Sequence, residues 1–290
     1  MSNKQFTILV TGSNGQLGEA LQLLAADFPD HRFLFTTKDD LDIVQPAALE
    51  KYFSAHSISF CINCAAYTAV DKAESDKENA FLVNANAVAS LADICHKHKT
   101  QLIHISTDYV FDGTANQPYI ETDRTNPVSI YGQSKMQGEE LALRNEPSAI
   151  IIRTSWLYSS VKNNFVTTML RLMKEKESIG VVNDQFGCPT YAADLAAAIM
   201  QIIVSGKSPE NPGIYHYTNA GIINWYDFAL AVKKLTGSNC TVNPITTAEY
   251  PTAAKRPAYS VLDTTKIKDI FDIDVSDWET SLQKCLFEHA

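Results

Sequence analysis

Residues 6–20 read FTILVTGSNGQLGEA, and this stretch decides the fold. Its first part, Phe6–Val10, is an apolar run typical of a short β-strand, and a helical pattern follows over Glu19–Asp27. Between them stand glycines at positions 12, 15 and 18. Glycine lets the backbone turn tightly and approach a pyrophosphate, and a helix N-terminus offers free N–H groups to phosphates. The stretch therefore predicts a dinucleotide-binding strand–loop–helix unit.

The end of the second expected strand, Arg32–Thr36, bears on the choice of cofactor. An acidic residue at this point binds the ribose 2′-hydroxyl of NAD, whereas this strand runs into Thr37 and Lys38, which tolerate a 2′-phosphate. Asp39 and Asp40 follow directly, so the preference for NADPH leaves NADH open as a cofactor. The glycine spacing also departs from the usual fingerprint, because its first gap is one residue longer.

Strands and helices continue to alternate as far as Arg153. This alternation predicts an α/β fold with a parallel, doubly wound (Rossmann-like) sheet, whose site lies at the C-terminal ends of the strands. Thr107 stands at such an end. The expected strands are Ile58–Asn63, Gln101–Ile105 and Ala149–Arg153, and the expected helices are Pro46–Ala55, Asp76–Lys97 and Ser134–Arg144.

Beyond Arg153 the alternation becomes irregular. Residues 181–190 are rich in polar groups and predict a loop. We expect a dinucleotide-binding domain over residues 1–155, to which residues 191–217 return, and a smaller, discontinuous substrate-binding lobe over most of 156–290. The expected helices here are Phe165–Lys176, Ala192–Val204, one from Asn224 to about Thr236, and short ones near Thr264–Phe271 and Asp277–Leu286, with an edge strand at Ile214–Tyr217.

The net charge of the chain limits its partners. The sequence has 24 Lys and Arg against 33 Asp and Glu, a formal net charge of −9. We do not expect so acidic a chain to bind a nucleic acid polymer or an anionic membrane, although a local basic pocket for a small phosphate ligand stays open. Residues 1–5 lack the long apolar region of a signal peptide, and no run of about 18 apolar residues suggests a membrane span. We therefore expect a cytoplasmic enzyme.

Two cysteine patterns could indicate other chemistry. Cys61 and Cys64 have the spacing of a redox motif, but they lie in a strand-like run, whereas a redox pair belongs at a helix N-terminus. Cys95 and His98 could suggest a metal site, yet no matching second pair follows them. We expect six free thiols and no metal.

Residues 131–135, YGQSK, suggest a reaction centre. They lie at an expected helix start, so Tyr131 and Lys135 project to one face. A Lys ammonium beside a phenol lowers the pKa of the Tyr toward working pH, which suits Tyr131 as a general acid. Thr107 can hydrogen-bond the same substrate oxygen from the strand end. Taken alone, Tyr-x-x-x-Lys can equally be a chance surface pair, and only a cofactor site elsewhere gives it meaning.

Longer motifs accompany these residues. They are AAYTAVDKAE at 65–74, STDYVFDG at 106–113, RTSWLY at 153–158, NDQFGCPT at 183–190, and Arg256-Pro257. With the glycine loop and YGQSK, in this order and spacing, the chain resembles the extended short-chain dehydrogenase/reductase family over nearly its whole length.

The resemblance implies an NADPH-dependent oxidoreductase that reduces the C4 keto group of a dTDP-linked sugar. Tyr131 then donates the proton, Lys135 holds the nicotinamide ribose and lowers the Tyr131 pKa, and Thr107 shares the hydrogen bond to the sugar oxygen. The implied cofactor contacts are Gly12, Gly15, Gln16, Leu17, Asp42, Ile43, Ala65, Ala66, Tyr67 and Ser106, beside Tyr131 and Lys135. The implied substrate contacts are Thr107, Asp108, Trp156, Gln185 and Arg256, of which Arg256 suits a pyrophosphate as a bidentate donor.

Plainer roles stay open for some of these residues. Trp156 could be a core residue, Asp108 and Asp184 could cap loops, and Arg256 could be a surface ion-pair partner. Some members of the family use magnesium at a subunit contact, but no acidic cluster here compels a metal. We allow for a homodimer, and the sequence leaves the oligomeric state open.

Two other function classes remain. One is a non-catalytic binding subunit on the same fold, against which the intact Thr107, Tyr131 and Lys135 weigh. The other is an epimerase or dehydratase that keeps its NAD bound. Such enzymes often carry Glu where this chain has Tyr109, which favours a simple reductase.

Overall fold

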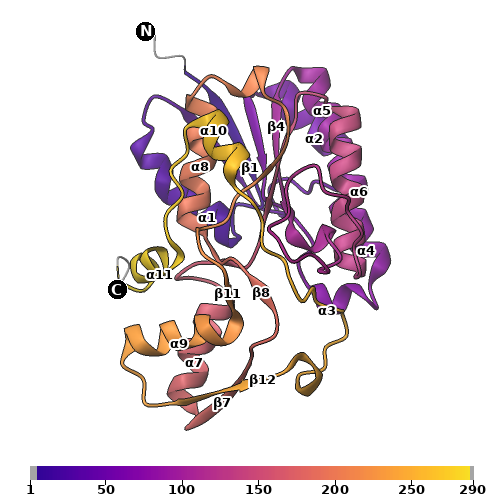
Figure 1. Cartoon of the computed structure of the whole chain (residues 1–290). Coiled ribbons are helices and arrows are strands. Elements are labelled where there is room, and N and C mark those ends of the chain that lie inside the picture. The colour runs from indigo at the N-terminus through magenta and orange to yellow at the C-terminus, as the bar shows by residue number, and fades with distance from the viewer. Residues whose placement is uncertain (1–4, 288–290) are drawn as a thin grey trace.

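The computed structural model describes residues 5–287, and within them the centre of the molecule is a parallel six-stranded sheet (Figure 1). Its strand order is β2-β1-β3-β4-β5-β10, and every neighbouring pair runs parallel. This confirms the predicted α/β fold with a doubly wound, Rossmann-like sheet. The strands are β1 Thr7–Thr11, β2 Arg32–Thr36, β3 Phe60–Asn63, β4 Gln101–Thr107, β5 Ile150–Thr154 and β10 Gly213–His216.

The strands form because they are nearly continuous apolar runs, as expected where helices cover both faces of a sheet. Helices α1, α8 and α10 lie on one face, and α2, α5 and α6 on the other (Figure 1). The helices are α1 Gln16–Leu24, α2 Pro46–Ala55, α5 Ala87–His98, α6 Ile130–Asn145, α8 Ala192–Val204 and α10 Thr265–Phe271.

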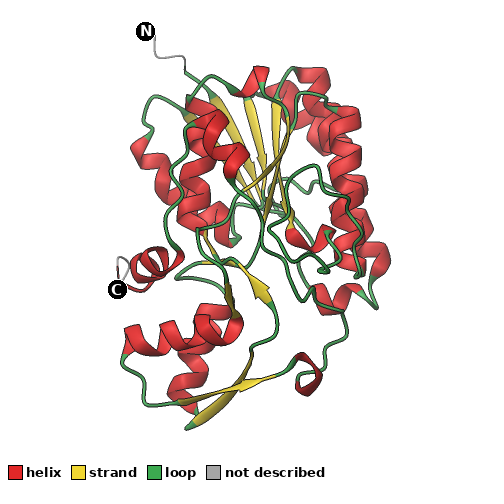
Figure 2. Ribbon diagram, viewed as in Figure 1, coloured by secondary structure: helices red, strands yellow, loops and turns green. Residues whose placement is uncertain are grey.

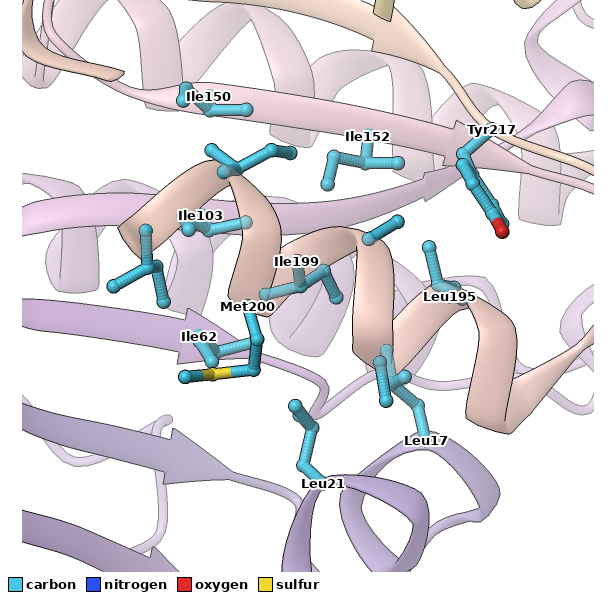
Figure 3. Close-up of a cluster of buried hydrophobic side chains, with 14 of the residues drawn as sticks. Leu17, Leu21, Ile62, Ile103, Ile150, Ile152, Leu195, Ile199, Met200 and Tyr217 are labelled. Atoms are coloured by element: carbon cyan, nitrogen blue, oxygen red, sulfur yellow. The ribbon is translucent and has the colours of Figure 1, made fainter. Parts of the chain in front are cut away.

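Helix α8 fills the larger core of the sheet. Its side chains Leu195, Ile199 and Met200 point from the helix toward the isoleucines of β3, β4 and β5 (Figure 3). Leu17 and Leu21 of α1 meet the same cluster, and all of these residues are buried. The helix and the edge strand β10 that follows it were both predicted, and both are confirmed as elements of this layer. The division into two domains remains a prediction.

The single long helix expected over residues 76–97 is wrong in detail. The chain forms α4 (Lys77–Phe81), then a π-helical turn (Leu82–Asn86), then α5. The wider turn places Asn84 in the interior, where its side chain bonds the backbone N–H and carbonyl of Tyr67 and the hydroxyl of Ser134. Helix α6 comes very close here, because a Cβ on Gly138 would lie 2.0 Å from the Asn84 carbonyl oxygen. Local sequence patterns carry no sign of such a long-range contact.

The loop predicted over residues 181–190 is also only partly correct. Val181 and Val182 belong to β7 (Ser178–Val182), which pairs in parallel with β12 (Thr241–Ile245). Ile179 and Val181 alternate into a separate apolar cluster, and this burial outweighs the polar residues that follow. Helices α7 (Phe165–Glu175) and α9 (Trp225–Thr236) pack on this pair and form the lower lobe (Figure 2).

Short elements join the sheet to the lower lobe. As predicted, Asn224 caps α9, its side chain accepting from the Asp227 N–H, and Gly237 ends the helix in a left-handed conformation. The remaining elements are α3 Val70–Ala73, β6 Leu157–Tyr158, β8 Phe186–Gly187, β9 Thr190–Tyr191, β11 Ile223–Asn224 and α11 Trp278–Phe287, with short 3₁₀ turns at 25–27, 108–110, 208–210 and 247–249.

Candidate functional site

The glycine loop after β1 forms a cradle at the C-terminal edge of the sheet. Gly12 has a φ of +64°, and a Cβ there would lie 2.7 Å from the Ala65 nitrogen, so the loop fits tightly over the end of β3. Gly15 precedes α1, and no side chain caps that helix end. Because the first N–H groups of a helix lack intrahelical partners, this end suits an anion such as a dinucleotide pyrophosphate.

Two expected cofactor residues of this loop use their side chains elsewhere. Gln16 binds the segment after β6: its amide oxygen accepts from Ser159 and Asn164, at 3.0 Å each. Leu17 is buried in the core beneath α8. Any contact that Leu17 makes to a cofactor is therefore made by its backbone, whereas Gln16 fastens α1 to the chain that leads into the lower lobe.

The ends of β2 and β3 border the same cradle. Lys38 is exposed beyond β2, and the Asp42 carboxylate accepts from the Val44 N–H, while Ile43 is buried. After β3, Ala65 and Ala66 are half-buried. Tyr67 is held on both sides of its backbone by Asn84 and donates its hydroxyl to Asp76.

Thr107, Tyr131 and Lys135, which we call the reaction centre, come together at the end of β4. Helix α6 starts at Ile130, earlier than expected, because the Ser129 hydroxyl caps it and the Ile130 N–H donates to Glu74. Gly132 allows the close approach: a Cβ there would lie 2.2 Å from the Tyr109 carbonyl oxygen. The side chain of Thr107 acts on the pKa of the Tyr131 phenol.

The expected effect of Lys135 on Tyr131 is wrong in this structure. Burial raises the pKa of Tyr131 to about 12, the side chain of Thr107 opposes this in part, and nearby Asp108 adds to the rise. The Lys135 ammonium instead donates to the Ile105 carbonyl at 2.6 Å and lies 3.3 Å from Nε2 of His104. Sequence spacing put the two side chains on one helix face, but the ammonium turns down toward β4.

Lys135 has a depressed pKa of its own. Its side chain is almost fully buried, and burial lowers the pKa to about 8, although the carboxylate of Glu139 and the thiol of Cys64 act in the opposite direction. Glu139 is itself bound by Arg153 through two hydrogen bonds to Nε and one of 2.7 Å to Nη2. The ammonium thus loses its proton within the range where enzymes work.

The residues around Thr107 supply further polar groups. The Thr107 hydroxyl donates to Asp108 at 3.0 Å and accepts from the Tyr109 N–H. Asp108 is buried, and burial raises the pKa of its carboxyl to about 6 although the side chains of Ser260 and Thr107 oppose the rise; its Oδ2 atom has no hydrogen-bond partner among the described residues. The buried Ser106 hydroxyl has no partner. A buried hydroxyl without a partner fits a site that a ligand's polar group completes.

Trp156, Gln185, Trp225 and Arg256 form a second group, which we call the C-terminal wall. Trp156 stacks on Trp225 with ring centroids 3.6 Å apart, and its φ of +50° is unusual for a bulky side chain. Gly187 lies against the ring of Trp156, since a Cβ there would meet it at 2.7 Å. Sequence reasoning named Trp156 but missed Trp225, because the stack joins residues far apart in the chain.

A cavity of about 530 Å³ lies along this wall. Gln185, Trp225 and Arg256 line it, together with Phe165 and apolar residues of α7 and β7. This volume is in the range of small-molecule sites. Arg256 also binds Asp71 of α3 by a bidentate ion pair of 2.8 and 3.1 Å, and Gln185 donates to Thr247.

Tyr109 connects the two groups. Its ring packs edge-on against Tyr131, with centroids 5.6 Å apart, and the charge of Arg256 acts on the pKa of its phenol. The structure therefore brings the predicted residues of the reaction centre next to a wall that the C-terminal part of the chain supplies. Asp184 borders the wall beside Gln185, and its carboxylate accepts from the backbone and hydroxyl of Thr247, as a loop cap.

The described residues also bear on a redox pair, a metal site and a membrane span. All six cysteines are free, as predicted, and burial raises the pKa of the Cys64 thiol far above its usual value, which does not suit a redox pair. Cys64 lies just past the end of β3 rather than in the strand. Between residues 5 and 287 we find no group of three or more side chains placed to hold a metal, and no helix with the length and apolarity to cross a membrane.

Comparison with known proteins gives consistent matches. The family described as RmlD substrate binding domain matches residues 6–290. A dTDP-4-dehydrorhamnose reductase of Aggregatibacter actinomycetemcomitans is 43% identical, covering 95% of this chain and 97% of its own. The crystal structure of a dTDP-4-dehydrorhamnose reductase from Clostridium acetobutylicum has a TM-score of 0.92 at 40% identity, covering 97% of this chain and 98% of its own. The enzyme of that name from Bacillus anthracis, solved in complex with NADP, has a TM-score of 0.94 at 35% identity, covering 98% and 100%.

Proposed function

The chain belongs to the RmlD substrate binding domain family, and on this premise we propose that it reduces the C4 keto group of dTDP-4-dehydro-L-rhamnose to give dTDP-L-rhamnose, with NADPH as the reductant. The observation that carries this proposal is the reaction centre, where the side chains of Thr107 and Tyr131 interact beside a buried lysine. Reduction of a ketone needs a hydride and a proton. This chain supplies the proton donor, and bound NADPH supplies the hydride.

The cradle at the ends of β1 and β3 would hold NADPH. The glycine loop and the uncapped end of α1 offer N–H groups to the pyrophosphate, and no acidic side chain ends β2. Lys38 is then free to meet a 2′-phosphate. The Ser106 hydroxyl, buried and without a partner, is placed at the end of β4 to bind a polar group of the cofactor.

Tyr131 is the general acid in this proposal. Its raised pKa keeps the phenol protonated throughout the working pH range, so the proton is present when charge develops on the C4 oxygen. Thr107 hydrogen-bonds the same oxygen. In the free protein the Thr107 hydroxyl donates its one proton to the Asp108 carboxylate, so it turns from Asp108 to the C4 oxygen when the sugar binds, and Asp108 can then bind a sugar hydroxyl.

Lys135 holds the cofactor ribose from below. Its ammonium has three N–H donors, of which the Ile105 carbonyl takes one and His104 faces another. A third donor remains for a hydroxyl of the ribose.

The C-terminal wall would bind the dTDP part of the substrate. Arg256 offers the fork geometry that pairs with a pyrophosphate, and Trp225 adds an aromatic ring to the lining of the cavity. We assign Gln185 and Trp156 to the same ligand. Because Asp71 holds Arg256 by two hydrogen bonds, the guanidinium is oriented before any ligand arrives.

Three further assignments belong to this proposal. We assign no nucleic acid polymer as a partner, because the chain is acidic and its proposed substrate is a nucleotide sugar. We assign a cytoplasmic location, because the proposed reaction is biosynthetic. A homodimer stays a prediction, to be checked by analytical ultracentrifugation.

A turnover assay tests the function. Purified protein is mixed with NADPH and dTDP-4-dehydrorhamnose generated in situ, and the oxidation of NADPH is followed by absorbance. We expect one NADPH to be consumed per sugar reduced and no tightly bound nicotinamide in the purified protein, since a net reduction releases oxidised cofactor each cycle. A retained, non-exchanging NAD, or no oxidation with this sugar, would overturn the proposal. The first result would favour the epimerase or dehydratase class.

A further inference from the structure

A row of polar side chains crosses an otherwise apolar face of the sheet. Thr11, Asn63 and His104 are register partners on β1, β3 and β4, so they point to the same side. Two residues earlier on the same face stand Leu9, Cys61 and Leu102, which belong to the core beneath α2, α5 and α6. The row is buried: Thr11 and His104 are 0% exposed and Asn63 is 1% exposed. Buried polar groups are costly unless they are paired, so this row needs a reason.

The row is a continuous hydrogen-bonded chain that ends on Lys135. The Thr11 hydroxyl lies 2.7 Å from the Asn63 amide oxygen, the Asn63 amide nitrogen 3.0 Å from Nδ1 of His104, and Nε2 of His104 3.3 Å from the Lys135 ammonium. Thr11 immediately precedes Gly12 of the phosphate cradle. This row of hydrogen bonds thus runs beneath the cofactor cradle, from the end of β1 to Lys135 of the reaction centre.

The charge on Lys135 decides which way these bonds point. An ammonium only donates, so Nε2 of His104 must accept, and the proton of a neutral imidazole must lie on Nδ1. Nδ1–H then needs the oxygen of the Asn63 amide, whereas the nitrogen faces Nδ1 in the structure, so we infer that the amide is turned over, which leaves its shape unchanged. The Thr11 hydroxyl accepts or donates and fits both orientations. Burial and the charge of Lys135 hold the pKa of His104 well below its usual value, so the ring stays neutral.

We propose that His104 is a positioning residue for Lys135, whose ammonium it holds through Nε2, and that Asn63 and Thr11 keep its imidazole in the tautomer that can accept. This inference rests on the proposed role of Lys135 in binding the cofactor. When Lys135 loses its proton, its amine can accept a hydrogen bond. The hydrogen bonds of the row then reverse, and His104 takes the Nε2–H tautomer. The other titratable groups that act on Lys135 are Cys64 beyond β3 and Glu139 on α6, and Glu139 is bound by Arg153.

Histidine NMR tests this in the free protein, without cofactor or turnover. In protein with ¹⁵N-labelled histidine, the His104 signal is assigned by its loss in His104→Gln. We expect the Nδ1–H tautomer at neutral pH and its reversal as the pH rises through the Lys135 pKa of about 8. His216 is the internal control: its Nδ1 faces the Tyr119 carbonyl and its Nε2 faces Arg153, so it keeps one tautomer throughout. A His104 that is Nε2–H or charged at neutral pH overturns the proposal.

Cofactor binding separates positioning from simple packing. His104→Phe removes the acceptor but keeps a ring, whereas His104→Gln supplies an amide oxygen. Losing one hydrogen bond to a charged group lowers the Lys135 pKa. In His104→Phe we therefore expect NADP⁺ affinity to fall about tenfold, and the alkaline limb of the pH dependence of this affinity to shift down by about one pH unit. The NADP⁺ affinity of His104→Gln should stay within about twofold of the wild-type value, because the amide oxygen replaces the acceptor. His216→Phe, a matched change in a buried histidine, should leave the alkaline limb in place.

Two results would refute the role of His104. One is wild-type NADP⁺ affinity and pH dependence in His104→Phe, and the other is an equal loss in the Phe and Gln variants, which would indicate packing alone. If His104→Phe does not fold, Asn63→Leu takes its place, because it leaves the ring but removes the group that orients it, and it should move the limb in the same direction by less. Failure of the wild type to reduce the sugar would count against the proposed function only, since the NMR and NADP⁺ measurements do not use the sugar.

Discussion

The reaction centre and the C-terminal wall are built in different ways. Thr107 ends β4, and Tyr131 and Lys135 lie in the first turns of α6, so all three are carried by long regular elements packed on the sheet. Trp156 stands instead in irregular backbone with a φ of +50°, and Arg256 lies in an extended segment held by Asp71. Thr107 and Lys135 are buried, whereas Tyr131, Trp156 and Arg256 are only partly so.

This difference follows from what each group has to do. Proton transfer depends on fixed distances and a dry surrounding, which a helix packed on a sheet provides. A wall that admits a large nucleotide sugar has to keep part of its surface open to water. We therefore expect changes in the reaction centre to act mainly on turnover, and changes in the wall to act mainly on substrate affinity.

Lys135→Met should have the largest effect on the ratio of turnover to the Michaelis constant for NADPH. The variant keeps the length of the side chain but loses the charge that we assign to the cofactor ribose beside Tyr131. We expect this ratio to fall about 10³-fold, within the range of acid–base contributions. Steady-state kinetics measures it, with the exposed Lys97→Met as control. A loss confined to cofactor affinity, with turnover intact, would remove Lys135 from the chemistry.

Arg256→Gln should act on the wall alone. Hydrogen bonds to a charged group are worth about 1.5–3 kcal/mol, so the Michaelis constant for the sugar nucleotide should rise about 10- to 100-fold. The turnover number should change little, and that contrast separates the two groups. Lys255→Gln, at the exposed neighbouring position, is the matched control. If turnover falls and the Michaelis constant does not, the guanidinium does not bind the substrate's pyrophosphate.

Thr107→Val should lower turnover less than any change at Tyr131 or Lys135. The substitution keeps the shape and removes a hydroxyl that only assists, so a loss of about fivefold is expected from one neutral hydrogen bond. Turnover at saturating substrate and cofactor gives the number. A drop as large as that of Lys135→Met would make Thr107 a principal group of the reaction rather than a helper.

Lys38→Ala should give the smallest effect. Lys38 is exposed, and exposed ion pairs contribute less than about 1 kcal/mol, so the Michaelis constant for NADPH should rise about threefold. The constant for NADH should stay unchanged, because NADH lacks the 2′-phosphate. Equal changes for both cofactors would show that Lys38 does not meet that phosphate.

Local patterns in the sequence were sufficient for most of the fold. The apolar run before Gly12 and the apolar stretch of α8 dictate their elements directly, because burial on both faces of a sheet leaves little choice. The reaction centre was also predictable, since Tyr131 and Lys135 lie one helical turn apart. In each case the signal lies within a few neighbouring residues.

The rest depends on contacts between distant parts of the chain. The π turn at Asn84 packs closely on helix α6 only because Gly138 has no side chain, and the stack of Trp156 on Trp225 depends on the space that Gly187 leaves. The direction of the Lys135 ammonium is set by His104 and the Ile105 carbonyl, which spacing along α6 does not reveal. The ion pair of Asp71 with Arg256 joins residues from opposite ends of the sequence for the same reason.

Replacing Tyr131 by Phe tests the role of the reaction centre. The change removes one hydroxyl, so the fold and the affinities for NADPH and sugar nucleotide should survive. The quantity to measure is the single-turnover rate of NADPH oxidation at saturating ligands, because it reports the chemical step. We expect it to fall by about 10²–10⁴-fold, the usual contribution of a general acid. A variant that keeps more than about a tenth of the wild-type rate would show that Tyr131 is not the acid.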